Sequence, residues 1–304
     1  MPTPFPSPTK TWHSTSYSSI SPTRPELSAK GKSILITGGG TGIGAETALS
    51  FAAAGAARIA LLGRREQPLL DTKASIQSQF ANVEVFTASA DVTEKDAVDA
   101  AFAAFVERAD GNGAGKIDVL VSAAAVIGPQ DPVETVDTER FLSSIDTNLR
   151  GALNTAQAFL RYASASAVII DVNSNAAVIN YGPGFSAYSV SKLSVFRLWD
   201  SVAAAKPSLS VFHLQPGVVD TDMNKEAGGV KAIGYEDHVS LPGHFNVWLA
   251  SGEASFLRGK FLYSNWDVEE LLERRGEIEG GGLLSVGLGG WPFEAGEWSP
   301  TWDK

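Results

Sequence analysis

Tyr188 and Lys192 have the types and spacing that most directly suggest chemistry, because they lie four positions apart in a stretch that reads as a helix. Side chains at positions i and i+4 of a helix lie one above the other on the same face. A phenol beside an ammonium group loses its proton more easily, because the positive charge favours the phenolate. Such a tyrosine can serve as a general acid or base. The pair taken alone is equally compatible with a ring packed under the lysine stem.

A glycine-rich segment, Thr37–Gly44 (TGGGTGIG), directly follows an apolar run and precedes a helical pattern. Glycines let the backbone turn tightly and approach a pyrophosphate without a Cβ in the way. The N-terminus of the following helix offers unpaired N–H groups and the positive end of its dipole. The succession of strand, glycine turn and helix therefore predicts a nucleotide-binding site.

Two arginines, Arg64 and Arg65, follow the second predicted strand. An acidic residue at this place would bind the two ribose hydroxyls of NAD, whereas arginines suit a 2′-phosphate. The sequence therefore favours NADP(H) over NAD(H). After the third strand come Asp91 and Val92. The Asp91 carboxylate is expected either to accept from the adenine amino group or to cap the next helix.

These motifs belong to an alternation of short apolar runs with longer amphipathic ones, which predicts α/β architecture. We expect a doubly wound, Rossmann-type parallel sheet of about seven strands in three layers, α/β/α, with ligands beyond the carboxyl ends of the strands. The predicted strands are Ser33–Thr37, Arg58–Leu62, Val83–Thr87, Ile117–Val121, Ala167–Val172, Ser210–Leu214 and Gly259–Tyr263. The predicted helices are Gly44–Ala54, Gln67–Phe80, Glu94–Arg108, Glu139–Ala163 and Tyr188–Ala205.

Three segments are expected along the chain. Residues 1–30 are rich in Pro, Ser and Thr, which predicts a flexible or loosely docked extension. Residues 31–275 are expected to form one catalytic domain. Residues 276–304 form a Gly- and Trp-rich tail, which folds over the domain, contacts another subunit or stays mobile.

The composition of the chain excludes several kinds of binding partner. The chain has 304 residues, a formal net charge of −10 and no cysteine. The negative charge argues against nucleic acid or an anionic membrane, because phosphates are bound by Lys and Arg. The lack of cysteine excludes disulfides and thiolate-bound metals and fits a cytoplasmic protein. No segment approaches the roughly 20 apolar residues of a membrane span. The four histidines show no ligand spacing, so no metal site is expected.

Over about residues 32–265, these motifs in this order resemble the short-chain dehydrogenase/reductase family. The motifs are Thr37–Gly44, Asp91, Asn148, Ser174, the Tyr188/Lys192 pair and Pro216–Thr221 (PGVVDT). The N-terminal extension and the segment Phe256–Leu271 are similar to fungal members, many of which serve biosynthetic pathways.

The resemblance implies catalytic roles for four residues. Tyr188 would donate the proton in carbonyl reduction and accept it in alcohol oxidation. Lys192 would hold the nicotinamide ribose and lower the pKa of the tyrosine. Ser174 would hydrogen-bond the substrate oxygen. Asn148 would help to hold a water in a proton relay to Lys192.

The resemblance also implies cofactor contacts. Val219 and Thr221 would contact its nicotinamide end, with Asn148, Tyr188 and Lys192 nearby. The remaining expected contacts are Gly38, Thr41, Gly42, Ile43, Gly44, Arg64, Asp91 and Val92.

Three positions depart from the family pattern. After the fourth strand the family usually has Asn-Asn-Ala-Gly, and this chain has Ser122–Ala125 (SAAA), so asparagine side chains that brace the strands are missing. Ser174 lies 14 positions before Tyr188, one more than is common, and Asn175 occupies the commoner position. The segment Asn173–Ala177 lacks the usual serine–glycine setting, which implies an altered pocket wall.

The expected function is reversible, NADP(H)-dependent hydride transfer to a small-molecule carbonyl or from a secondary alcohol, with Asp220–Val239 as a lid over the substrate. Family members commonly form homodimers or homotetramers through helices such as Glu139–Ala163 and Tyr188–Ala205. Two alternatives stay open. One is an NADP(H)-binding sensor or scaffold without turnover, and the other is an isomerase or dehydratase that uses the same Tyr–Lys pair.

Overall fold

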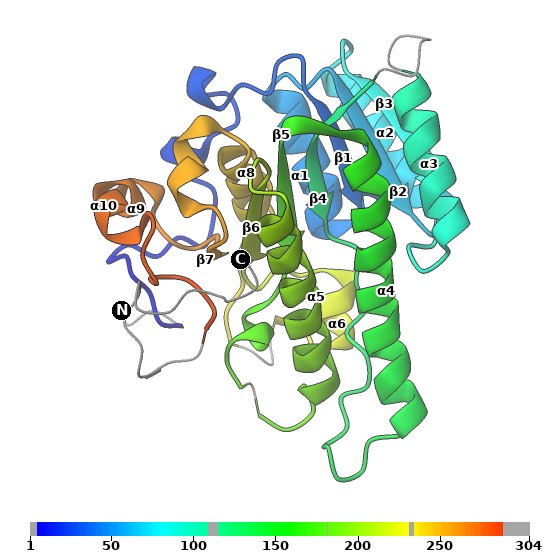
Figure 1. Ribbon diagram of the computed structural model, residues 1–304, viewed down its shortest axis with the longest axis vertical. Coiled ribbons are helices and arrows are strands. Elements are labelled where there is room, and N and C mark those ends of the chain that lie inside the picture. The colour runs from blue at the N-terminus through cyan, green and yellow to red at the C-terminus, as the bar shows by residue number, and fades with distance from the viewer. Residues whose placement is uncertain (1–4, 109–114, 181, 231–233, 288–304) are drawn as a thin grey trace, which may run out of the picture.

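The computed structural model describes residues 5–108, 115–180, 182–230 and 234–287. Within these ranges the chain forms one seven-stranded parallel sheet in the order β3-β2-β1-β4-β5-β6-β7 (Figure 1). The strands are β1 Ser33–Thr37, β2 Arg58–Gly63, β3 Glu84–Ser89, β4 Ile117–Ser122, β5 Ala163–Val172, β6 Ser210–Gln215 and β7 Phe261–Tyr263. The order reverses beside β1, so the predicted doubly wound Rossmann-type class is confirmed.

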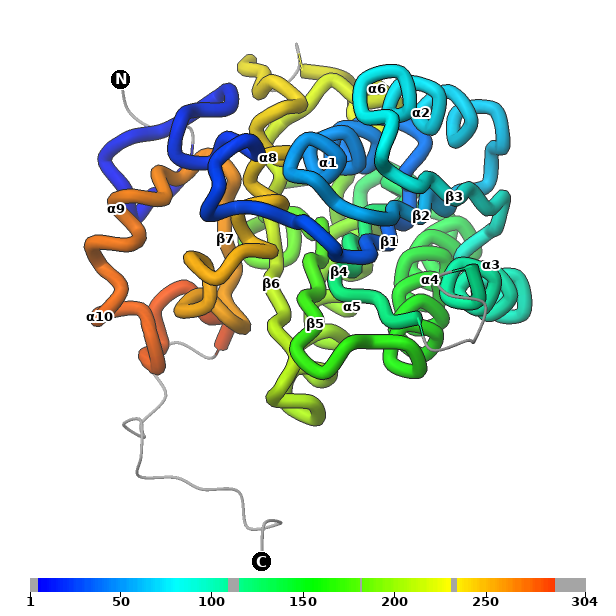
Figure 2. Tube along the Cα trace, turned by 90° about the horizontal axis from the view of Figure 1, so that it is seen from above, coloured from blue at the N-terminus to red at the C-terminus, as the bar shows by residue number. Residues whose placement is uncertain are grey.

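Helices cover both faces of the sheet, as the view in Figure 2 shows, with α1, α2 and α8 on one face and α3, α4 and α5 on the other. The α-helices are α1 Gly42–Ala53, α2 Glu66–Gln79, α3 Lys95–Glu107, α4 Thr138–Tyr162, α5 Ser186–Ala205, α6 Asp222–Glu226, α8 Ser240–Leu249, α9 Val268–Glu273 and α10 Arg275–Ile278. None of these described helices is long and apolar enough to cross a bilayer.

Alternation along the central strands creates two cores. Ile34 and Ile36 of β1 pack in the core under α1 and α8, whereas Leu35 packs in the core under α3, α4 and α5. All five β1 residues are buried, because neighbouring side chains of a strand point to opposite faces and both faces are covered. The glycine turn that follows β1 therefore starts from a rigid, fully paired strand.

β5 begins at Ala163, four residues before its predicted start, because α4 ends at Tyr162 and the chain enters the strand without a loop. The added residues, Ala163–Ser166, have no apolar run that would mark a buried strand. They are half-buried or exposed, and a register irregularity follows the pairing of Ala163 with Ile117. The extra strand length is held by backbone pairing rather than by side-chain burial.

The N-terminal extension, which the composition predicts to be flexible or loosely docked, packs closely on the domain. Residues 5–30, here called the N-terminal arm, pack along the β7 edge beside α8 and α9 (Figure 2). Ile20 and Leu27 are 0% and 2% exposed. The Tyr17 hydroxyl donates to Trp266 O at 3.0 Å and accepts from Val268 N at 2.9 Å. The Pro- and Ser-rich composition hid these anchors, because their partners lie about 250 residues away in sequence.

The described part of the C-terminal tail also packs on the domain. Phe261 N donates to Leu284 O at 2.8 Å. Lys260 Nζ donates to Gly281 O and to Ser285 Oγ at 2.5 and 3.0 Å. Trp291, Trp298 and Trp302, which gave the tail its predicted character, lie outside the described residues. The boundaries at residues 30 and 275 stay predictions.

Candidate active site

The glycine turn folds back on itself at the carboxyl end of β1. Gly38 has φ 72°, a left-handed conformation that glycine adopts without strain. A Cβ on Gly44 would lie 2.2 Å from Gly38 O, so no side chain fits there. Gly38 N and Gly39 N donate to Leu62 O at 2.8 and 3.2 Å, which fastens the turn to β2. The N-terminus of α1 therefore lies beyond the carboxyl end of β1, where its N–H groups can bind an anion.

The hydroxyl of Thr37 braces the two central strands. Ala123 N and Ala124 N both donate to Thr37 Oγ1, at 3.1 and 3.2 Å. These backbone groups belong to the Ser122–Ala125 segment, where the family's asparagines are missing. The backbone of this segment lies close to Gly38, because an added Cβ on Gly38 would lie 3.0 Å from Ala124 N. The loop after β4 is therefore held to the glycine turn by backbone groups.

Three connected cavities in the described part of the chain run along the carboxyl ends of the strands, with volumes of about 170, 310 and 660 Å³. We call them the outer, middle and inner cavities. Thr41 and Arg64 line both the outer and the middle cavity. Tyr188 and Thr221 line both the middle and the inner cavity. The cavities therefore form one trough that leads from Arg64 to Tyr188.

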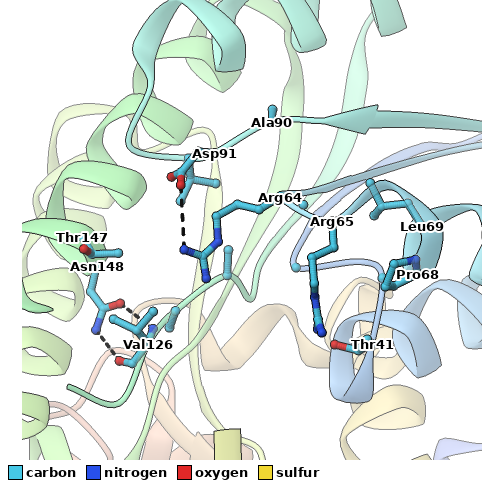
Figure 3. Close-up of a pocket in the computed structure, with 16 residues that line it drawn as sticks. Thr41, Arg64, Arg65, Pro68, Leu69, Ala90, Asp91, Val126, Thr147 and Asn148 are labelled. Atoms are coloured by element: carbon cyan, nitrogen blue, oxygen red, sulfur yellow. Dashed lines mark hydrogen bonds and ion pairs between the residues drawn. The ribbon is translucent and has the colours of Figure 1, made fainter. Parts of the chain in front are cut away.

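The outer cavity carries the charged residues predicted at the ends of β2 and β3 (Figure 3). Arg64 reaches toward Asp91, with Nη1 3.9 Å from Oδ2, and Arg65 Nη2 lies 3.6 Å from Asp222 Oδ2. Both arginine side chains are about two-thirds exposed, at 65% and 66%. Each guanidinium therefore stays accessible to an anion in the trough.

Asp91 does not cap the next helix, because the N-cap residue of α3 is Glu94. Its Oδ1 accepts instead from Thr93 N and Thr93 Oγ1 at 2.9 and 2.7 Å. Burial pushes the pKa of Asp91 upward, but the Thr93 hydrogen bonds and the Arg64 charge outweigh it and hold the pKa below its ordinary value. Val92 lines the same cavity. Asp91 is thus an ionised acceptor on the cavity wall.

Tyr188 and Ser174 meet where the middle cavity opens into the inner one. Both side chains line the inner cavity, and the Ser174 hydroxyl opposes the rise in the Tyr188 pKa, so Ser174 lies beside the tyrosine. Ser174 follows β5 and its Oγ accepts from Ala176 N at 3.2 Å. Asn175 instead lies fully buried, with its N–H donating to Gln215 Oε1 at 2.7 Å. The longer spacing is absorbed by the loop between Ser174 and α5.

The protonation of Tyr188 differs from the expectation that Lys192 lowers its pKa. Burial raises the pKa of Tyr188 to about 12, the Ser174 hydrogen bond opposes this, and the Asp171 charge adds to it. Lys192 Nζ lies 5.7 Å from the Tyr188 ring centroid and donates to Val172 O at 2.8 Å. Helical spacing alone therefore does not bring the ammonium close enough to offset the effect of burial on the Tyr188 pKa.

Asn148 of α4 holds the loop that follows β4. Its Oδ1 accepts from Val126 N at 2.8 Å, and its Nδ2 donates to Val126 O and to Ser191 Oγ, each at 2.9 Å. Ser191 lies inside the Tyr188–Lys192 segment. Asn148 therefore ties α5, which carries the tyrosine and lysine, to the wall of the outer cavity. Its expected role in holding a water stays a prediction.

The segment after β6 lines the inner cavity. Val219 is 6% exposed, and Thr221 contacts both the middle and inner cavities. Thr221 also caps α6, because its Oγ1 accepts from Asn224 N at 3.1 Å. Met223 and Tyr235, from the expected lid, line the inner cavity as well. Described parts of the expected lid thus line the cavity that Tyr188 and Ser174 share, whereas its residues 231–233 lie outside the described residues. A lid function stays a prediction.

A buried polar network beneath the site has no counterpart in the sequence-based prediction. Asn173 Oδ1 accepts from Ser174 N at 2.8 Å, and its Nδ2 donates to Asp171 Oδ2 at 2.6 Å and to Lys192 O at 3.2 Å. His213 Nδ1 lies 3.0 Å from the same Asp171 oxygen. Asp171 and His213 are 1% and 0% exposed.

The network positions the catalytic candidates. Through Asn173, the Asp171 carboxylate fixes the backbone of both Ser174 and Lys192. Burial lowers the pKa of Lys192, and the Asp171 charge opposes this. The contact between Asp171 and His213 follows from strand pairing, because the two residues lie opposite each other in the register of β5 and β6. It becomes readable only once the strand order is known.

Comparisons with known proteins agree with this arrangement. The family model for short chain dehydrogenases matches residues 32–230. The chain is 33% identical over 284 residues to the short chain dehydrogenase/reductase AacuD of Aspergillus aculeatus, a match that covers 92% of this chain and 96% of that one. It is 33% identical over 289 residues to a short chain dehydrogenase/reductase of Claviceps purpurea, covering 93% and 95%.

Solved structures show the same architecture. A dehydrogenase/reductase from Sinorhizobium meliloti matches with 26% identity and a TM-score of 0.68, covering 79% of this chain and 95% of that one. An NAD⁺-bound xylitol dehydrogenase, 24% identical, matches in fold with a TM-score of 0.68 over 77% and 98% of the two chains.

Proposed function

The chain belongs to the short-chain dehydrogenase/reductase family and is an oxidoreductase, and we propose that it transfers a hydride between NADP(H) and a carbonyl or secondary alcohol of a small molecule. The observation that carries the proposal is the place of Tyr188. It lies at the junction of the middle and inner cavities, and Ser174 lines the inner cavity with it. A proton donor at that junction can reach a molecule in either cavity.

The residues along the trough fit a dinucleotide. The glycine turn leaves a backbone cradle at Gly44 that a Cβ would fill, and the adjacent helix N-terminus favours a pyrophosphate. Asp91 offers an ionised acceptor for an adenine amino group. Lys192 uses one hydrogen-bond donor on Val172 O, and an ammonium has three. Two donors are therefore left for the hydroxyls of a nicotinamide ribose.

The choice of NADP(H) over NAD(H) rests on charge at the end of β2. Gly63 is followed by Arg64 and Arg65, at the positions where an acidic residue would accept from the ribose hydroxyls of NAD. Arginine pairs with phosphate through two parallel hydrogen bonds. The fold by itself does not determine whether NADP(H) or NAD(H) binds, since the xylitol dehydrogenase with a similar fold is NAD⁺-bound. The two exposed guanidinium groups support the 2′-phosphate.

Replacing both arginines, as Arg64→Ala/Arg65→Ala, is expected to weaken NADPH binding by at least about tenfold, because charge-assisted hydrogen bonds contribute about 1.5–3 kcal/mol each. NADH binding should change by less than about threefold, because NADH lacks the phosphate. Isothermal titration with each nucleotide measures both values. The control Arg161→Ala/Arg197→Ala removes the same charge from surface ion pairs elsewhere. Equal losses for both nucleotides would contradict the assignment.

In the proposed reaction, a nicotinamide held in the trough would supply or accept the hydride, and side chains of the protein would supply or accept the proton. Tyr188 carries its proton at neutral pH, since its pKa is raised to about 12, so it is ready to protonate a carbonyl oxygen. Ser174 adds a hydrogen bond that stabilises charge developing on that oxygen. Asn173 and Asp171 keep Ser174 and Lys192 in place beneath the substrate.

Asp171→Asn is expected to move the alkaline limb of the pH profile for carbonyl reduction to lower pH. The Asp171 charge raises the pKa of both Tyr188 and Lys192. Removing it lets the proton donor and the ammonium lose their protons at lower pH. The measurement is kcat/KM against pH. Asp200→Asn, which breaks an exposed ion pair with Arg197, should leave the limb unmoved. If the alkaline limb of the Asp171→Asn profile stays at the wild-type pH, Asp171 does not set the pKa of the proton donor.

The proposal is tested by following oxidation of NADPH and of NADH with a panel of ketones and aldehydes. Turnover that is faster with NADPH is expected. Tight NADPH binding without oxidation of any alcohol or reduction of any carbonyl would favour the sensor or scaffold. A product with the oxidation state of its substrate would favour the isomerase or dehydratase.

The proposal also covers the pathway and the oligomeric state of the protein. The fungal relatives support a place in a biosynthetic pathway. Exposed apolar side chains on the adjacent helices α4 and α5 support the expected homodimer or homotetramer; they are Leu142, Leu153, Leu160, Val190 and Leu193. The cytoplasmic location stays a prediction.

A further inference from the structure

Aromatic side chains form part of the wall of the inner cavity. Phe5, Phe185 and Tyr235 line it together with Tyr188 and Met223. Phe5 comes from the N-terminal arm, Phe185 precedes α5 and Tyr235 belongs to the lid segment. Three parts of the chain that are far apart in sequence thus bring aromatic rings to one cavity. A ring system in the substrate would find edges and faces to pack against.

The N-terminal arm determines where the ring of Phe5 lies. Its ring centroid lies 5.9 Å from that of Tyr235 in an edge-to-face arrangement with an interplanar angle of 70°. It lies 6.2 Å from Tyr263 of β7 and 6.4 Å from Trp12 of the arm. Phe5 therefore joins the lid residue Tyr235 to the sheet edge and closes the cavity on the side away from α5.

The arm that carries Phe5 is fastened outside the cavity. Lys10 N and Thr11 N donate to the Glu270 carboxylate at 2.6 and 2.9 Å. Trp12 forms an antiparallel bridge with Trp266, and His13 Nε2 lies 2.8 Å from Asp267 Oδ2. These contacts do not involve the trough. They hold the arm in position while leaving the Phe5 ring for the cavity.

The inner cavity is uncharged along its described lining, which includes no Asp, Glu, Lys, Arg or His. Its polar groups are hydroxyls and amides, such as those of Ser174, Asn173 and Gln215. Removing an ionised group from water without a partner costs several kcal/mol. The lining therefore disfavours an anionic or cationic substrate portion and suits a neutral one whose carbonyl faces Tyr188.

We propose that the inner cavity selects neutral ketones that carry an aromatic ring, and that Phe5 of the N-terminal arm is a specificity-determining residue for that ring. This inference rests on the proposed function for the identity of the reacting group. The stacking preference itself is a property of the cavity wall and is measurable by binding alone.

The experiment compares 2-tetralone with 2-decalone, its fully saturated analogue, in the full-length protein. Dissociation constants come from isothermal titration, and kcat/KM values come from NADPH oxidation. The wild type is expected to prefer 2-tetralone in both measurements. Phe5→Ala should reduce that preference by about two- to tenfold, because aromatic pairs contribute about 0.5–1.5 kcal/mol beyond their buried area. The preference is a ratio, so it does not depend on the fraction of active protein.

Two further variants separate the ring from mere bulk and stability. Phe5→Leu restores apolar volume without a ring and should stay close to Phe5→Ala in preference. Phe80→Ala removes a partly buried phenylalanine that packs at the end of α2, and should leave the preference at the wild-type value.

The outcomes distinguish the two proposals. An unchanged preference in Phe5→Ala, with turnover intact, overturns the role of Phe5. A Phe5-dependent binding preference without NADPH oxidation supports the cavity assignment and overturns the proposed reaction. Equal affinity of the wild type for the two ketones, or binding of neither, overturns the aromatic selectivity.

Discussion

Tyr188→Phe is expected to lower kcat/KM for carbonyl reduction by about a thousandfold, within the range of about 10²–10⁴ that positioned proton transfer contributes. Phenylalanine keeps the ring and its packing but has no proton to give. NADPH affinity should change little, because the arginines, the glycine turn and Lys192 are untouched. Steady-state kinetics and nucleotide titration on the same preparation measure the two quantities.

The control for this variant is Tyr162→Phe, which removes a hydroxyl from the last residue of α4. It should keep wild-type activity. Circular dichroism and the thermal midpoint exclude unfolding, since Tyr188→Phe also removes the interaction of the phenol with Ser174. Wild-type turnover in Tyr188→Phe would reject Tyr188 as the proton donor and with it the proposed mechanism.

Gly44→Ala is expected to weaken NADPH binding by about a hundredfold or more. The new Cβ would lie 2.2 Å from Gly38 O and 2.8 Å from Gly38 C, which are backbone atoms that cannot swing aside. The turn must open, and its N–H groups then no longer converge on the pyrophosphate. Losing two charge-assisted hydrogen bonds at about 1.5 kcal/mol each corresponds to about that factor. Nucleotide titration measures the change.

Gly252→Ala is the matched control, because a Cβ there meets nothing within 4 Å and its φ is not left-handed. It should bind NADPH as the wild type does. The Gly44→Ala variant should remain folded, since α1 is anchored by Ala48 and Phe51, both fully buried. Undiminished NADPH affinity in a folded Gly44→Ala variant would mean that the turn does not hold the pyrophosphate.

Local patterns predicted most of the architecture. The apolar runs located the seven strands within a few residues, because burial on both faces leaves a continuous apolar signature in each strand. The glycine turn was readable because its conformation depends on residues adjacent in sequence. The start of β5 was not, since Ala163–Ser166 join the sheet through backbone pairing that no side-chain pattern marks.

The candidate site likewise combines features that the sequence predicts with features that depend on tertiary packing. Tyr188, Ser174 and Lys192 were found from motif order, and the structure brings them to one end of the sheet. The Tyr188/Lys192 spacing predicts a lowered pKa for Tyr188, whereas burial raises it. Tyr188 lines a cavity with Ile43, Val172 and Pro216, which are distant in sequence, so no short spacing records its surroundings.

The sequence by itself determined which residues we propose for the chemistry and the order in which strands and helices form, because both depend on residue type and short spacing. The tertiary structure alone decided that Phe5 closes the inner cavity, that Thr37 braces Ala123 and Ala124, and that Asp171 and His213 pair beneath the site. Each of these contacts joins residues at least 40 positions apart. No local periodicity records such a contact, so it appears only when strand order brings the partners together.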